Sequence, residues 1–117
     1  MAWLKETTEQ LKLAYEISKE DPDEAVRICQ EVFKFDTSNA AALFLIGNVY
    51  NRAEKYALAI PVYKMCVELA PHRHEAWNNL GMCYVDCQEF EKARDCFKRC
   101  LQISPNSANY LSNLADE

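Results

Sequence analysis

The sequence predicts an all-helical fold of about seven helices, and three observations lead to this prediction. Only two glycines and four prolines occur among 117 residues, so hairpins and long loops are not expected. Packing residues such as Trp77, Leu80, Gly81 and Tyr84 fall at helical spacing. The same arrangement returns at a fixed interval of 34 residues, which indicates an internal structural repeat.

Composition and charge exclude several classes of protein. Half of the residues are apolar and 26% are charged, as in ordinary soluble domains. The formal net charge of −5 argues against nucleic acid as a partner, because phosphate binding needs clustered Lys and Arg. No apolar run approaches the roughly 20 residues of a membrane helix. The first ten residues, MAWLKETTEQ, contain too short an apolar stretch for a secretory signal, so a cytoplasmic protein is expected.

Eight pairs of positions carry the repeat. They are Leu43/Trp77, Ile46/Leu80, Gly47/Gly81, Tyr50/Tyr84, Ala59/Ala93, Tyr63/Phe97, Cys66/Cys100 and Pro71/Pro105. The small residues allow two helices to approach closely, the large ones fill the space between repeats, and each proline ends a helix.

The pattern W-x2-L-G-x2-Y, A-x3-F, P resembles the tetratricopeptide repeat family over residues 40–107. The resemblance implies antiparallel helix pairs stacked into a right-handed superhelix, with the first helix of each pair lining a concave face. The expected organisation is one domain, residues 1–117. It comprises a degenerate repeat (6–39), two full repeats (40–73 and 74–107) and the start of a fourth repeat or a capping helix (108–117).

The first repeat departs from the pattern. Its second helix is clear, because Asp21 can cap it and Pro22 suits its first position. Its first helix matches the repeat pattern only if Leu13, Ala14 and Ile17 fill the packing positions and the turn after it is one residue shorter. The expected helices span 7–19, 22–35, 39–52, 56–69, 73–86, 90–103 and 107–116.

The C-terminal segment suggests that a fourth repeat begins and is cut. Leu111 and Leu114 fall where Leu43 and Ile46 do in their repeat. We therefore expect a fragment of a longer protein, with a single capping helix as the alternative. An exposed Leu111/Leu114 stripe also makes self-association through the C-terminal helix possible.

No catalytic constellation is found, so a non-enzyme without cofactor is expected. His72 and His74 lie around a turn and are expected to face water. The spacing of Cys83, Cys87, Cys96 and Cys100 on two paired helices admits a four-thiolate zinc site. Buried packing thiols are the preferred interpretation, because free cysteine behaves as a small hydrophobe. No metal is expected.

The binding residues are those that the resemblance places on the concave face. They are Lys12, Tyr15, Phe44, Leu45, Asn48, Arg52, Asn78, Asn79, Met82, Asn109 and Asn113. One mode known in the family is a carboxylate clamp for the acidic tail of cytosolic heat-shock chaperones. It is rejected, because Phe44 replaces its first lysine while Asn109 and Asn113 replace later cations. The other is an asparagine ladder that holds a peptide backbone, to which Asn79 and Asn113 would contribute.

The function expected from the sequence is a non-catalytic module that binds a protein or an extended peptide in its concave groove. Two alternatives remain open. In the first, the chain is the repeat arm of a larger enzyme such as a glycosyltransferase. In the second, it is a small secretion or assembly chaperone.

Overall fold

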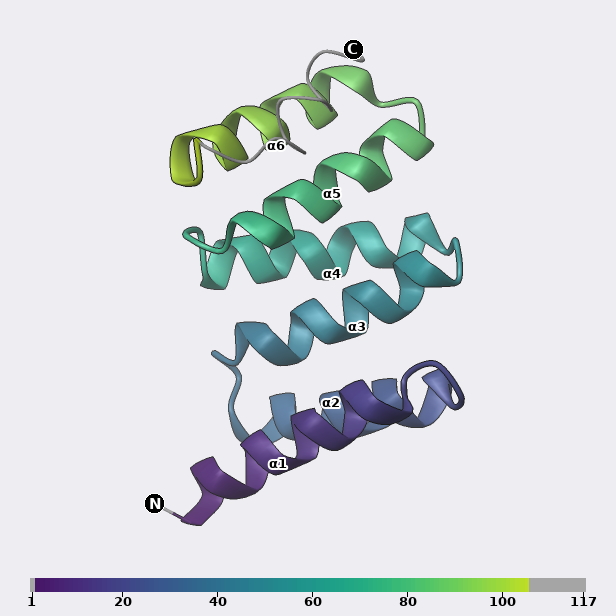
Figure 1. Cartoon of the computed structure of the whole chain (residues 1–117), viewed down its shortest axis with the longest axis vertical. Coiled ribbons are helices and arrows are strands. Elements are labelled where there is room, and N and C mark those ends of the chain that lie inside the picture. Colours follow the sequence, from purple (N-terminus) through teal and green to yellow (C-terminus); the bar gives the residue numbers. More distant parts are fainter. Residues whose placement is uncertain (1, 106–117) are drawn as a thin grey trace.

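The computed structural model describes residues 2–105, and the side chains of residues 6–105. This part of the chain contains six helices and no strand: α1 (Ala2–Ile17), α2 (Pro22–Phe35), α3 (Ala40–Arg52), α4 (Tyr56–Leu69), α5 (His74–Asp86) and α6 (Phe90–Ile103). Consecutive helices run antiparallel and stack along one axis (Figure 1). The all-helical repeat architecture expected from the sequence is confirmed. The seventh expected helix lies outside the described residues.

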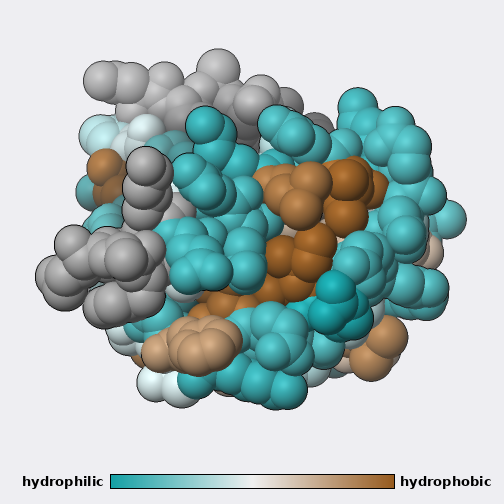
Figure 2. Space-filling view, turned by 90° about the horizontal axis from the view of Figure 1, so that it is seen from below, coloured by the Kyte–Doolittle hydropathy of each residue, from teal (hydrophilic) through white to brown (hydrophobic). Residues whose placement is uncertain are grey.

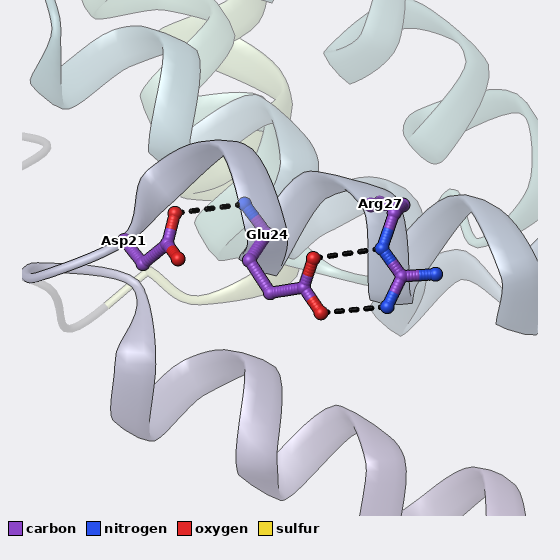
Figure 3. Close-up of polar contacts among 3 residues, drawn as sticks. All are labelled: Asp21, Glu24 and Arg27. Atoms are coloured by element: carbon purple, nitrogen blue, oxygen red, sulfur yellow. Dashed lines mark hydrogen bonds and ion pairs between the residues drawn. The ribbon is translucent and has the colours of Figure 1, made fainter.

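The ends of α2 and α3 follow from their capping residues. The Asp21 carboxylate accepts a hydrogen bond from the Glu24 backbone N–H at 3.2 Å (Figure 3). Pro22 occupies the first turn of α2. Asn39 caps α3 in the same way by accepting from the Ala42 N–H at 3.1 Å. Such caps satisfy donors that the first helical turn leaves unpaired. Arg27 then braces Glu24 through two hydrogen bonds of 2.6 and 2.7 Å (Figure 3).

Helix α1 differs most from the expected bounds. It begins at Ala2 rather than near residue 7, because the segment AWLKE contains no residue that breaks a helix. It ends at Ile17 rather than at residue 19. The Ser18 hydroxyl donates to the Tyr15 carbonyl at 2.8 Å, and the Asp21 N–H reaches the Ile17 carbonyl at 2.8 Å. These bonds close the turn that leads into α2.

Each full repeat is held together by a glycine that makes room for an aromatic ring. A Cβ atom placed on Gly47 would lie 2.5 Å from the Tyr63 ring, and one on Gly81 would lie 2.6 Å from the Phe97 ring. Both rings are fully buried. The sequence suggested that the glycines let helices approach each other. The structure shows that the nearest atoms belong to the aromatic ring of the facing helix, which follows Ala59 or Ala93 by four residues.

The first repeat fills its packing positions only in part. Ala14 is fully buried and Ile17 packs against the core formed by α1, α2 and α3. Leu13 is 48% exposed, so the expectation that it fills a packing slot is wrong in this structure. The helix that would cover this position in a later repeat has no counterpart here among the described residues.

The turns inside the two full repeats share an unusual backbone conformation. Glu54 and Gln88 have φ angles of 60° and 63°, and they are 34 residues apart. In each turn the next residue donates back to the helix, from Lys55 N to Tyr50 O and from Glu89 N to Tyr84 O. This left-handed helix end usually carries glycine.

Within the described residues, no helix is long and apolar enough to cross a membrane.

Candidate binding groove

A cavity of about 590 Å³ lies between the first helices of the first two pairs, α1 and α3. Five of its lining residues are apolar or aromatic and five are polar. They are Leu11, Tyr15, Ala41, Phe44 and Leu45, with Thr8, Lys12, Glu16, Asn39 and Asn48. The apolar residues come from both helices, so the cavity is a feature of the stack and not of either helix alone.

The structure brings five of the sequence-predicted groove residues together in this cavity: Lys12, Tyr15, Phe44, Leu45 and Asn48. They differ in exposure. Tyr15 is 69% exposed, while Leu45 is 8% exposed and belongs largely to the core. The Tyr15 ring is therefore accessible to a ligand, and Leu45 contributes to the floor.

Arg52 takes part in an internal contact near the end of α3. Its Nη1 donates to the Ser18 Oγ at 3.3 Å, and Ser18 itself is buried. The Ser18 hydroxyl in turn donates to the Tyr15 carbonyl. Arg52 thus ties the last turn of α3 to the end of α1, beside a residue that lines the cavity.

Asn48 and Asn79 belong to a chain of side-chain hydrogen bonds that crosses three helices. The Asn48 Oδ1 accepts from the Tyr63 hydroxyl and, at 2.9 Å, from the Asn79 Nδ2. Nearby, the Cys83 thiol donates to Asn51 Oδ1 at 3.5 Å. Burial raises the pKa of the Tyr63 hydroxyl well above its usual range, so it stays a donor. The Asn79 amide thus joins α5 to α3, and its role in a peptide-binding ladder stays a prediction.

The other predicted groove residues lie apart from the cavity or outside the described chain. Asn78 is half-buried on α5 and has an interaction partner within the protein. Met82 is 40% exposed. Asn109 and Asn113 lie outside the described residues.

Sequence reasoning did not single out Arg73, Thr8, Glu16 or Asn39. The Arg73 guanidinium lies 5.3 Å from the centre of the Phe44 ring, in a cation–π contact. Arg73 stands in the turn before α5, 29 positions from Phe44, so helix periodicity contains no signal for this contact. Thr8 and Glu16 could have been found by extending the periodicity of Lys12 and Tyr15 by one turn in each direction.

The cysteines serve mainly as packing residues. Five are buried, and the repeat-equivalent pair Cys66 and Cys100 donate to the Ala40 and His74 carbonyls at 3.4 and 3.3 Å. Burial raises the pKa of Cys83 and Cys100 to about 12. Cys87 is exposed, so the expectation of a buried thiol is wrong there. Among the described residues, no three His, Cys, Asp or Glu side chains are placed to share a metal ion.

Two segments match the sequence profile of the tetratricopeptide repeat, residues 40–73 and residues 74–107. Together they cover more than half of the chain. The chain belongs to the tetratricopeptide repeat family. The Gly–ring pairs and the stacked helix pairs are thus the packing of tetratricopeptide repeats, and the cavity lies on the side formed by their first helices.

Several relatives share part of this sequence. A BBSome complex member BBS4 from Bos taurus is 32% identical over 72 residues, which is 62% of this chain and 12% of that protein. The chloroplastic tetratricopeptide repeat domain-containing protein PYG7 from Arabidopsis thaliana is 36% identical over 62 residues, which is 53% of this chain and 21% of that protein. The chain therefore spans only a small part of the length of these relatives.

Solved tetratricopeptide repeat structures share the fold. The first repeat domain of Spaghetti (RPAP3), bound to the HSP90 peptide SRMEEVD, matches with a TM-score of 0.89 at 20% identity and covers 96% of this chain and 90% of that one. The Thermobaculum terrenum O-GlcNAc transferase mutant K341M matches with a TM-score of 0.85 at 23% identity, covering 97% of this chain and 22% of that one. At these identities the likeness establishes the fold.

Proposed function

We propose that this tetratricopeptide repeat chain is a non-catalytic binding module that holds a segment of a partner protein in its concave groove. The observation that carries the proposal is the cavity between α1 and α3. Its volume of about 590 Å³ lies within the range of ligand-binding pockets, about 300–1,000 Å³. Its wall combines aromatic surface with a few polar groups, which is the usual composition of a recognition site.

The lining favours a segment with one large apolar side chain. Tyr15 and Phe44 come from different helices and present two aromatic rings to the same cavity. An aromatic or aliphatic anchor placed between them gains burial against both rings. Lys12 and Glu16 lie on the α1 wall, and they can pair with polar groups on either side of the anchor. Asn48 has two N–H donors in addition to its engaged oxygen, which suits a peptide carbonyl.

The related fold supports a peptide as the ligand. The Spaghetti (RPAP3) domain of similar shape is bound to an HSP90 peptide. In this chain Phe44 occupies the cavity wall and Arg73 stacks on it, so we propose an apolar anchor in place of a gripped carboxylate. We also propose a reducing, cytoplasmic setting, because the buried thiols act as packing groups and hydrogen-bond donors.

A display library of random peptides followed by fluorescence anisotropy on the selected peptide tests this proposal. Tyr15→Ala and Phe44→Ala are each expected to weaken binding about tenfold or more, the usual loss at an aromatic anchor. Phe90→Ala is the matched control, because Phe90 is a 52% exposed phenylalanine on α6, away from the cavity. The control should bind as the wild type does.

Two results would refute the proposal. One is a library that yields no binder. The other is a set of binders that Tyr15→Ala and Phe44→Ala retain with unchanged affinity, since binding would then use another surface.

A further inference from the structure

The outer face of the first helix pair is a repeat-packing surface that the described chain leaves uncovered. Leu13 takes the repeat position of Ile46 and Leu80, allowing for the shorter turn. Those two residues are 5% and 3% exposed, whereas Leu13 is 48% exposed. The difference arises because the second helix of each pair packs on the first helix of the next pair, α2 on α3 and α4 on α5. In the described structure no helix precedes α1 to do the same.

Helices α1 and α2 form a shallow groove on this face. Its volume is about 330 Å³ and its lining residues are Gln10, Leu13, Glu24, Arg27, Ile28, Glu31 and Phe35. Phe35 is 81% exposed, so its aromatic side chain gains little free energy from burial in the described structure. Figure 2 views the molecule from this end and shows apolar surface bordered by polar residues on both sides. An apolar patch with a polar rim is typical of an interaction surface.

The charges along α2 follow a regular order. Glu24, Arg27, Glu31 and Lys34 are spaced by three, four and three residues, so they fall on one stripe of the helix. Arg27 contacts Glu24 at 2.6 Å and Lys34 contacts Glu31 at 3.1 Å. The signs therefore alternate along the stripe. Ile28 lies beside its middle.

We propose that a second copy of this chain packs on this face, with the two α2 helices antiparallel about a two-fold axis near residue 29. In this register Glu24 faces Lys34 of the second copy, and Arg27 faces Glu31 of the second copy. The symmetry repeats both pairs, so every acid on the stripe meets a base. Ile28 lies near the axis. Leu13 and Phe35 become covered at the sides.

The order of charges along α2 favours a second copy of this chain over a helix of another protein. A parallel pairing in register sets Glu24 opposite Glu24 and Arg27 opposite Arg27, which is repulsive. A helix of another protein needs the complementary order of charges, whereas the stripe of this chain already contains its own complement. The contact is that of a single helix pair, so it belongs to the weak class of interfaces and is expected in the micromolar range.

Sedimentation equilibrium of the 117-residue chain, from low to high micromolar concentration, tests the proposal. The wild type is expected to shift from monomer to dimer. Two charge variants sharpen the test. Glu24→Lys with Glu31→Lys makes the stripe wholly basic, and Arg27→Glu with Lys34→Glu makes it wholly acidic. Each variant alone should lose at least about tenfold in dimer affinity, because like charges then face each other. An equimolar mixture of the two should form a one-to-one dimer.

Matched controls separate the stripe from net charge and from folding. Glu68→Lys with Glu91→Lys changes the net charge as the basic variant does, but at exposed positions on α4 and α6, and it should dimerise as the wild type does. Phe35→Ser alters a residue that is largely exposed, so it should stay folded and dimerise less. Circular dichroism of every variant verifies its helix content.

Three outcomes would overturn the proposal. The first is a wild type that stays monomeric throughout, which would leave the face to a different partner. The second is dimerisation of the two charge variants or of Phe35→Ser at wild-type strength, which would place self-association elsewhere. The third is a mixture of the two charge variants that does not associate, which would exclude the antiparallel register.

Discussion

Replacing Gly47 with alanine tests the packing of glycine against an aromatic ring, which joins the two helices of each full repeat. The new Cβ would lie 2.5 and 2.7 Å from two carbons of the Tyr63 ring. Tyr63 is fully buried, so its ring has no solvent into which to withdraw. Overpacking of this kind costs about 1–3 kcal/mol. Alanine recovers about 1 kcal/mol of that cost, because it favours a helix more than glycine does.

Gly81→Ala provides the baseline for the clash alone. Its Cβ would lie 2.6 Å from the buried Phe97 ring, and a net loss of about 1 kcal/mol is expected from the same two effects. Tyr63 differs from Phe97 by a hydroxyl that donates to Asn48. A displaced ring breaks this bond at a further cost of about 1 kcal/mol. Gly47→Ala is therefore expected to lose about 2 kcal/mol, roughly twice the loss for Gly81→Ala.

Urea denaturation followed by circular dichroism measures these free energies of unfolding. Each kcal/mol corresponds to about 4–8 °C in Tm for a domain of this size. The Tyr63→Phe background is the decisive control. There the extra cost of Gly47→Ala should vanish and leave the loss seen for Gly81→Ala. The reasoning fails if Gly47→Ala is as stable as the wild type, or if its extra cost persists without the hydroxyl.

Three further predictions concern the thiols and one turn. In the native protein a thiol reagent should label Cys87 quickly and the five buried cysteines slowly, with all six labelled in denaturant; a mass spectrum showing several fast sites would contradict this burial. Burial raises the pKa of Cys83 to about 12, so the unfolded chain loses this thiol proton first as the pH rises past about 9. The contribution of Cys83 to stability should be constant below about pH 8 and then fall by up to about 1.4 kcal/mol per pH unit, and Cys83→Ala should make the decline at alkaline pH in urea titrations shallower. Gln88→Gly should raise the free energy of unfolding by about 1 kcal/mol, because glycine adopts the φ of 63° without strain; no gain in Tm would show that this turn is not strained.

The fold could be predicted because its determinants are local and recur. A glycine and an aromatic residue at fixed spacing, such as Gly81 and Phe97, specify one helix pair, and the interval of 34 residues repeats it. The helix cap at Asp21 could also be predicted. Its side chain accepts a hydrogen bond from the backbone N–H three residues later in the chain, so the cap needs no tertiary partner. The start of α1 could not be predicted, because a run of residues without a helix breaker or a capping residue does not mark where the helix begins.

The groove could be predicted only in part. The resemblance to the tetratricopeptide repeat implied that Tyr15 and Phe44 share the concave face, and the structure brings both to one cavity. Periodicity does not show which polar side chains are already engaged within the protein. Asn79 has the spacing of a groove residue, yet its amide donates to Asn48 on a neighbouring helix. That contact depends on the angle and distance between α3 and α5.

The sequence by itself determined the repeat and the helix pairing, because each follows from side-chain size and spacing along one or two helices. Only the tertiary structure decided that Arg73 stacks on Phe44, that Asn48 joins Tyr63 to Asn79, and that Leu13 stays exposed. These features depend on distances between helices that are far apart in the chain. Such distances result from the packing of the whole stack, and no local pattern encodes them.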